Sequence, residues 1–313
     1  MNRTNILFFV TITLSLLASV YIIVTSNPIQ PTLQPTLQHK QAQTFLTDVI
    51  GLDLTKYTLT LLPTKEIPQV QTEYDENNQE YQVESASNQF KAYIEYENNK
   101  LTRSRLRWIE EPTQIANYSN DPLEIAKDFV KRFKEFSQEP YMIEIQQMLD
   151  QITKIEPLTI VSDSEEIIMK IIQEDPYLYF QWERTVNGIH NNYNKVSLIL
   201  RDNFFSSSLD TWESRTISNV EVEISKDEAI NIAKQQAKNY TYVFADNVVS
   251  NFIVLDEPVV AELSMEIKDE NLVSPIWHIR LALAEVYPGL VTEIRVSLWA
   301  DTGELVWINH AGP

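Results

Sequence analysis

Hydrophobic residues recur at helical spacing in three stretches, and each stretch is followed by segments in which hydrophobic and polar residues alternate. The helical stretches begin near residues 41, 120 and 225, and the alternation is clearest in Phe90–Tyr96 and Trp277–Leu283. Residues three and four apart share one face of a helix, whereas alternate residues share one face of a strand. The pattern predicts an α+β fold of three helix-plus-antiparallel-sheet modules, over residues 41–118, 119–224 and 225–313.

Local signals mark the ends of the expected helices. Gly51 is placed to end the first helix, and Asn120 or Asp121 is placed to cap a second helix that Pro122 opens. A further short helix is expected over Tyr141–Ile152, after Pro140. Ser225 with Glu228 forms a capping box, in which two side chains satisfy free amides at the start of the third long helix.

Turn residues separate the expected strands. Asn98 and Asn99 lie between two alternating segments and predict a hairpin. Asp301 and Gly303 predict a tight turn near the C-terminus, because aspartate bonds its own backbone and glycine readily adopts a left-handed conformation. The chain is therefore expected to end on the last hairpin of the module that starts at Ser225.

The N-terminus contains an apolar segment of the length needed to cross a membrane. Ile6–Val24 has 19 residues and no charge, and Arg3 precedes it within a short tip of residues 1–5. The next basic residue is Lys40, so the N-terminus is expected in the cytoplasm and the bulk of the chain outside. The length favours an uncleaved signal-anchor; the alternative is a signal peptide cleaved near Val24–Ser26.

Residues 25–40 read "TSNPIQPTLQPTLQHK", with prolines at positions 28, 31 and 35 and the run Pro-Thr-Leu-Gln occurring twice. Proline favours an extended, stiff backbone, so this segment predicts a stalk that separates the outer modules from the membrane. A short proline-rich recognition site is the alternative reading of the same composition.

Composition narrows the range of functions. The chain of 313 residues has 44 Asp and Glu against 25 Lys and Arg, a formal net charge of −19, which repels phosphate backbones and argues against nucleic-acid binding. It has 5 glycines, none of them in a phosphate-binding loop, and no cysteine for disulfides, thiolate chemistry or a zinc–thiolate site. No cofactor is expected.

Residues that commonly carry catalysis or bind metals do not form a recognisable motif. The histidines are dispersed, at His39, His190, His278 and His310, and none has the spacing of a zinc-protease helix. Tyr74–Tyr81 resembles part of a calcium loop but lacks its glycine and its final carboxylate, and a polar inter-strand loop is the preferred interpretation. The adjacent carboxylates Glu110–Glu111 and Glu165–Glu166 are assigned no role, because neighbours on a strand point to opposite faces.

Two further features concern the surface. Asn117 and Asn239 begin Asn-X-Ser/Thr triplets, which are glycosylation acceptors in cells that modify surface proteins. The six tryptophans and 14 tyrosines lie mostly in strand-like segments, where packing within the sheet is expected. An aromatic sugar- or peptide-binding face is the alternative for whichever side of a sheet remains exposed.

The C-terminal module resembles a PepSY domain. The resemblance rests on "SKDEA" at Ser225–Ala229, on "PIWHIRLAL", and on "EIRVSLWADTGELVWI" with its Asp-x-Gly-Glu turn. The segment Tyr179–Asp202 is similar to the strand pair of YcdB/YcdC and thermolysin-propeptide-like domains, in which an Arg-x-x-Asn-Gly-Ile run joins two strands. That run places Asn187 and Gly188 in a turn here. Together these matches cover residues 177–313.

The resemblance implies an extracytoplasmic α+β domain, often associated with a membrane or a peptidase, and it brings no catalytic motif. Members of the family are proposed to modulate peptidases. No protease domain follows the propeptide-like segment, so a peptidase that this chain inhibits is expected to be a separate molecule. The expected function is therefore non-enzymatic binding of a peptide, a peptidase or another envelope protein. The alternatives are a structural or sensory ectodomain that partners another membrane protein, and an envelope enzyme with an unrecognised site.

Overall fold

A computed structural model describes residues 37–62, 77–86, 88–108, 119–218, 220–269 and 271–312. The chain divides into two compact units, Met1–Lys40 and Gln41–Pro313, and the fold described below is that of the second unit. No helix within the described ranges is long and apolar enough to cross a membrane. The predicted anchor Ile6–Val24 lies outside the described residues.

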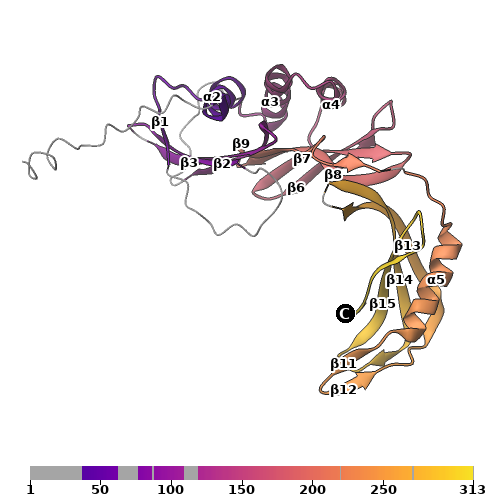
Figure 1. Cartoon of the computed structure of the whole chain (residues 1–313). Helices are drawn as coiled ribbons and strands as arrows, with labels where there is room; N and C mark the ends of the chain where they lie inside the picture. Colours follow the sequence, from indigo (N-terminus) through magenta and orange to yellow (C-terminus); the bar gives the residue numbers. More distant parts are fainter. Residues whose placement is uncertain are drawn as a thin grey trace, which may run out of the picture. The chain divides into compact units, whose positions relative to one another are not determined.

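The described residues form a mixed α+β structure in which strands predominate (Figure 1). The helical elements are α2 (Leu37–Thr44), the π-helical turn η1 (Phe45–Val49), α3 (Pro122–Ser137), α4 (Tyr141–Asp150) and α5 (Lys226–Asn239). The strands are β1 (Thr58–Leu61), β2 (Asn77–Glu84), β3 (Gln89–Glu97), β4 (Lys100–Trp108), β5 (Leu158–Val161), β6 (Ile167–Glu174), β7 (Tyr177–Val186), β8 (Ile189–Arg201), β9 (Phe204–Asp210), β10 (Thr216–Ile217), β11 (Tyr242–Phe244), β12 (Asn247–Val249), β13 (Val254–Asp269), β14 (Leu272–Tyr287), β15 (Val291–Trp299) and β16 (Leu305–Ala311).

Most of these strands belong to one sheet. Its main path runs β1-β2-β3-β4-β9-β8-β13-β14-β15-β16, and β7, β6 and β5 continue from β8 as a branch. The strand neighbours are antiparallel except at β8–β13 and β10–β14, which are short parallel contacts. Strands β11 and β12 form a separate hairpin.

The first two predicted modules share one hydrophobic core. Strand β4 of the first module pairs with β9 of the second, with Arg103 opposite Leu209, so the two sheets are continuous. Buried residues from η1, β3, α3 and β7 accordingly belong to a single cluster, which includes Phe45, Phe90, Phe133 and Trp182. The division predicted near residue 118 therefore does not separate two cores.

The C-terminal module has its own core beneath α5. Ala229, Ala233 and Ala237 lie four residues apart and are fully buried, so the centre of the buried helix face carries small side chains. A helix with such a face can approach a sheet closely, and the space is filled by larger residues of β14 and β15 such as Trp277 and Val296. This core, like the first, lies on one side of its strands.

The predicted helix starts agree with the local geometry. Asp121 accepts a hydrogen bond from the Leu123 amide at 2.9 Å, and Ser225 accepts one from the Glu228 amide at 3.3 Å. Each bond satisfies one of the amides left free at a helix start. Asn98 and Asn99 both have positive φ, at 51° and 63°, as the predicted hairpin turn requires.

Three sequence-based expectations differ from the structure. The first helix begins at Leu37, inside the segment predicted as a stalk, whereas Gly51 follows its helical end with φ of 80°, as predicted. The helix predicted over Tyr141–Ile152 ends at Asp150. The polar loop predicted over Tyr74–Tyr81 is wrong for its second half, because β2 begins at Asn77 and pairs with β3.

Candidate functional site

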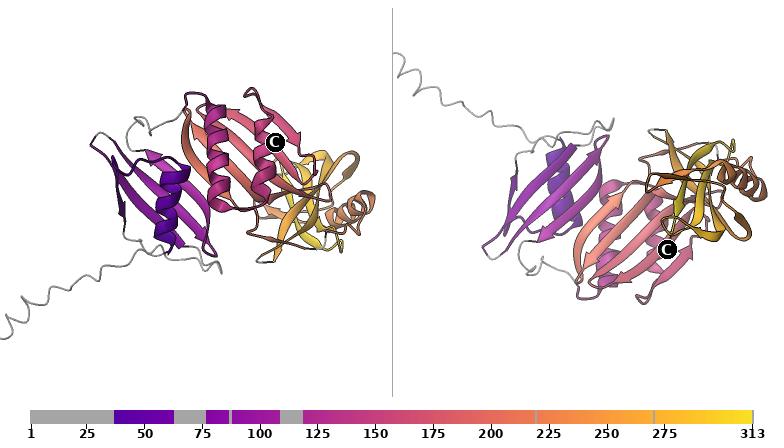
Figure 2. Two further views of the ribbon diagram at one scale, coloured as in Figure 1. Left: turned by 90° about the horizontal axis from the view of Figure 1, so that it is seen from above. Right: turned by 90° about the horizontal axis from the view of Figure 1, so that it is seen from below.

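The sheet built from β2, β3, β4, β9, β8, β7 and β6 has one covered and one uncovered face. Helices α3 and α4 lie across one side, whereas the view from the other side shows strands without a helix over them (Figure 2). In β3, Phe90, Ala92 and Ile94 are fully buried, while the alternating Lys91 and Tyr93 remain half exposed. We call the uncovered side the helix-free face.

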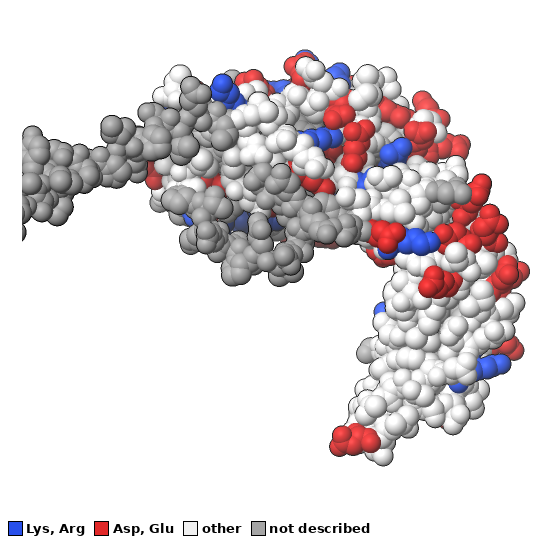
Figure 3. All heavy atoms as spheres, in the orientation of Figure 1, with Lys and Arg blue, Asp and Glu red and all other residues white. Residues whose placement is uncertain are grey.

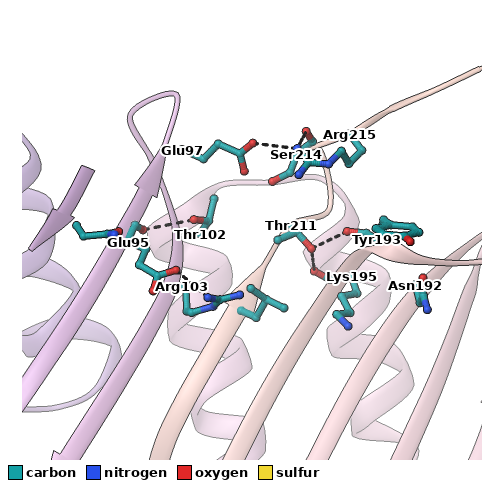
Figure 4. Close-up of a pocket in the computed structure, with 12 residues that line it drawn as sticks. Glu95, Glu97, Thr102, Arg103, Asn192, Tyr193, Lys195, Thr211, Ser214 and Arg215 are labelled. Carbon is teal, nitrogen blue, oxygen red and sulfur yellow. Dashed lines mark hydrogen bonds and ion pairs between the residues drawn. The ribbon is translucent and has the colours of Figure 1, made fainter. Parts of the chain in front are cut away.

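A polar pocket of about 480 Å³ opens between the β3–β4 hairpin and the ends of β8 and β9 (Figure 4). The residues that line it come from the five strands β2, β3, β4, β8 and β9 and from the loop after β9. They are Asn78, Glu95, Glu97, Thr102, Arg103, Asn192, Tyr193, Lys195, Leu209, Thr211, Ser214 and Arg215. Hydroxyl, amide and charged groups dominate this lining, which suits recognition of a polar or charged group rather than an apolar one.

The charged groups of the pocket are unequally paired. Arg103 forms an ion pair of 3.0 Å with Glu95, and Arg215 lies 3.4 Å from Glu97. Lys195 is the third cation of the lining, and no ion pair joins it to another residue in the part of the chain that the structure describes. Three cations against two carboxylates leave the lining with one excess positive charge, so the pocket favours an anionic group.

Two buried asparagines hold one wall of the pocket in place. Asn191 and Asn194 are fully buried, and the Asn191 side-chain amide donates to Asn194 Oδ1 at 2.9 Å. Asn194 in turn donates to the backbone carbonyls of Trp212 and Arg215, at 2.7 Å and 3.0 Å. These bonds fix the irregular start of β8 against the loop after β9, so the pocket wall is pre-organised.

Sequence reasoning missed this pair, although the stretch "HNNYN" carried a signal. Three asparagines within a strand of alternating residues interrupt its hydrophobic rhythm. The structure records a register shift at this place, between Glu183 and Arg184 of the neighbouring β7. Polar side chains that bond to backbone groups commonly stabilise such irregularities in strands.

A second polar cluster lies beside the pocket. Glu183 of β7 is 5% exposed and contacts both Lys170, at 2.6 Å, and His190. Burial alone would raise the pKa of Glu183, but hydrogen bonds and charge from His190 and Lys170 outweigh it and lower the pKa to about 2. The carboxylate is therefore ionised and occupied by its two partners.

A third cluster joins α4 to the strands. The Tyr141 hydroxyl donates to both carboxylate oxygens of Asp210, at 2.8 Å and 2.7 Å, and Lys100 lies 3.0 Å from Glu139. Tyr141 also stacks on Trp212, with ring centroids 4.9 Å apart. Burial raises the pKa of Asp210 above its usual range despite the nearby Lys100. The cluster fastens the helix to the sheet, and no group of it lines the pocket.

His190, His278 and His310 each have a polar partner close by. His190 contacts Glu183, and the His310 Nδ1 atom lies 2.7 Å from the Tyr240 hydroxyl. His278 Nδ1 lies 2.7 Å from Ser297 Oγ, a pair that could suggest a nucleophile and its base. Ser297 is fully buried, however, so a substrate has no access to its hydroxyl. Among the described residues, no group of three or more His, Cys, Asp or Glu side chains could hold a metal ion.

The turn residues singled out in the sequence lie away from the pocket. Asn187 and Gly188 join β7 to β8 with φ of 51° and 76°, and Gly303 has φ of 71° between β15 and β16. Asp301 forms an ion pair of 2.7 Å with Lys268. Burial would raise the pKa of Asp301, but the lysine outweighs it and lowers that pKa.

Of the two predicted glycosylation acceptors, Asn239 lies within the described residues and Asn117 does not. Asn239 is exposed at the end of α5. Asn117 lies outside the described residues, as does the acidic pair Glu110–Glu111. The other acidic pair, Glu165–Glu166, lies in and beside the turn before β6.

Comparison with known proteins finds a weak similarity to a solved structure and no matching family. No protein-family model matches the chain, and no curated protein matches it. Among solved structures, the chain is similar to the C-terminal domain of YpeB from Bacillus megaterium, with 11% sequence identity and a TM-score of 0.39. The similarity covers 90% of this chain and 99% of that domain. The PepSY resemblance of residues 177–313 stays a prediction.

Proposed function

We propose that this chain is a non-catalytic binding protein that recognises a peptide segment of another protein outside the cytoplasm. In this proposal Ile6–Val24 anchors it in the membrane, and the pocket beside β3, β4 and β8 receives the ligand. Modulation of a peptidase, as in the proposal for the PepSY family, is the finer version of the same function.

The pre-organised polar pocket is the observation that carries the proposal. Its wall is fixed by the buried bonds of Asn191 and Asn194, so little ordering is needed when a ligand binds. The pocket offers hydroxyl, amide and cationic groups in a volume of about 480 Å³, which fits a few residues of a peptide rather than a whole protein surface. None of its described lining residues pairs a nucleophile with a general base.

A pocket-filling substitution tests the proposal. The full-length chain, purified in a non-ionic detergent, would be titrated against a library of fluorescent nonapeptides that differ in charge, with anisotropy as the readout. Ser214→Trp places a large ring at the pocket, and we expect it to weaken binding of the best peptide by at least about 10-fold. Asn231→Trp on the exposed side of α5 serves as the matched control and should leave binding unchanged.

Two results would contradict the proposal. The first is a wild-type chain that binds no peptide of the library with measurable affinity. The second is a Ser214→Trp variant that is folded by circular dichroism and still binds the best peptide as tightly as the wild type. Peptide cleavage during the titration would instead favour the enzyme alternative.

A further inference from the structure

The helix-free face carries a row of arginines that the overall charge of the chain does not predict. Arg103, Arg105 and Arg107 occupy every second position of β4, and all three are exposed. Alternate residues of a strand point to the same side, so the three guanidinium groups share one face. They do so in a chain whose formal net charge is −19.

Strand register shows what surrounds this row. On one side, Arg105 lies opposite Tyr93 of β3, and on the other it lies opposite Ser207 of β9. Ser207 is in turn opposite Ile199 of β8, and Ile199 is opposite Tyr179 of β7. The side chains of Tyr93, Ile199 and Tyr179 are all half buried. The cations therefore border a partly apolar, partly aromatic surface.

Several positive charges on this face are free for a ligand. Arg103 is occupied by Glu95 at 3.0 Å, and Lys91 is occupied by Glu80 at 2.6 Å. In contrast, no ion pair within the described ranges involves Arg105, Arg107 or Lys195. Elsewhere carboxylates dominate the surface, as Figure 3 shows around α4 and α5. The unpaired cations are thus a local exception in a negative field.

We infer that the helix-free face binds an extended acidic peptide segment, with carboxylates at alternate positions that meet Arg105 and Arg107. This inference rests on the proposed function and specifies its ligand. Two residues of an extended strand span about 7 Å, and the same spacing separates alternate carboxylates of an extended ligand that follows β4. A guanidinium group binds a carboxylate through two parallel hydrogen bonds, which favours such a ligand over its amide counterpart.

The surrounding charge argues against larger polyanions. A nucleic acid or an anionic membrane would place many phosphates near the acidic remainder of the chain, where they are repelled. A short segment with two or three carboxylates can stay beside Arg105 and Arg107. The apolar neighbours Tyr93 and Ile199 would contact the uncharged side chains of such a segment.

Paired peptides and paired variants test the inference. The full-length chain in non-ionic detergent would be titrated with a fluorescent nonapeptide that carries glutamate at alternate positions, and with the same peptide carrying glutamine instead. We expect the glutamate peptide to bind at least about 10-fold more tightly. The double variant Arg105→Glu/Arg107→Glu should lose that preference and leave the affinity of the glutamine peptide within about 2-fold.

The control variant carries the same change in net charge at a different place. Lys131→Glu on α3 and Lys226→Glu on α5 both alter exposed lysines, and together they should leave both affinities unchanged. The Arg105→Lys/Arg107→Lys variant keeps the charge but loses the paired hydrogen bonds, so it should retain only part of the preference. Melting temperatures of all variants would be compared with that of the wild type.

Several outcomes would overturn the inference. One is equal binding of the glutamate and glutamine peptides; if Ser214→Trp weakens both, the proposed function survives while the acidic ligand does not. Another is an equal loss of affinity for the glutamate peptide in Arg105→Glu/Arg107→Glu and in the control Lys131→Glu/Lys226→Glu, which would indicate only long-range electrostatics. Tighter binding of a single-stranded oligonucleotide or of vesicles rich in phosphatidylglycerol would assign the face to a different partner. If no peptide binds at all, both proposals fall.

Discussion

The buried carboxylate of Glu183 provides the sharpest prediction for stability. Its pKa falls from 4.5 to about 2 in the folded chain, where Lys170 and His190 surround it. A group whose pKa is lowered on folding stabilises the fold above its unfolded pKa, and this contribution is lost as the pH falls through the folded value. One pKa unit corresponds to about 1.4 kcal/mol, so ionised Glu183 contributes about 3 kcal/mol at pH 7.

Replacing Glu183 with glutamine removes that contribution and keeps the shape of the side chain. We expect Glu183→Gln to lower the free energy of unfolding by about 3 kcal/mol at pH 7. At pH 3, which lies below the unfolded pKa of Glu183, the carboxyl group is already protonated in the unfolded chain, so the expected loss falls to about 1 kcal/mol. Urea denaturation followed by tryptophan fluorescence at both pH values measures the difference. Removal of one partner of a buried pair is costly because the other charge, here that of Lys170, is left without its partner.

Glu95→Gln is the matched control for this prediction. Glu95 also pairs with a cation on the helix-free face, but its side chain is 36% exposed and that of Arg103 is 48% exposed. Exposed pairs contribute little, so we expect a change below about 0.5 kcal/mol at either pH. The reasoning is refuted if Glu183→Gln costs no more than Glu95→Gln at pH 7, or if its cost is the same at pH 3 as at pH 7.

Three further substitutions probe other parts of the fold. Tyr141→Phe removes the hydroxyl that donates to Asp210, which is only 2% exposed, and should cost about 1–3 kcal/mol by urea denaturation; a loss below about 0.5 kcal/mol would contradict the assigned role of that bond. Gly188→Ala and Gly303→Ala both strain a backbone with positive φ, by about 1 kcal/mol each. An added Cβ at Gly303 also meets Ile232 Cδ1 at 3.1 Å, whereas nothing lies within 4 Å of an added Cβ at Gly188. Gly303→Ala should therefore lower the melting temperature more than Gly188→Ala, and equal shifts would show that the contact with Ile232 is unimportant.

Many local elements of this fold could be predicted because they depend on residues close in the chain. The cap at Asp121 and the cap at Ser225 involve residues two or three positions apart, and the turn at Asn98–Asn99 follows from the backbone preferences of asparagine. The clusters beside the candidate site depend on longer separations. Ser104 and Ser208, which meet at 2.7 Å where β4 pairs with β9, are 104 residues apart.

An alternating pattern specifies that a strand has two unlike faces, but it does not specify which strand lies next to it. For that reason the sequence predicted separate modules, while the β4–β9 pairing merged the first two into one core. The pocket was equally out of reach, because its lining comes from β2, β3, β4, β8 and β9 together.

The sequence by itself determined the periodicity of the helices and strands, their caps and turns, and the strong negative charge, because these properties belong to neighbouring residues or to composition. Only the tertiary structure decided which strands pair and which face of the sheet α3 and α4 leave uncovered. That choice places Arg105 and Arg107 beside Tyr93 and Ser207 on an open surface. The physical reason is that strand pairing is settled by the packing of the whole core, to which distant segments contribute together.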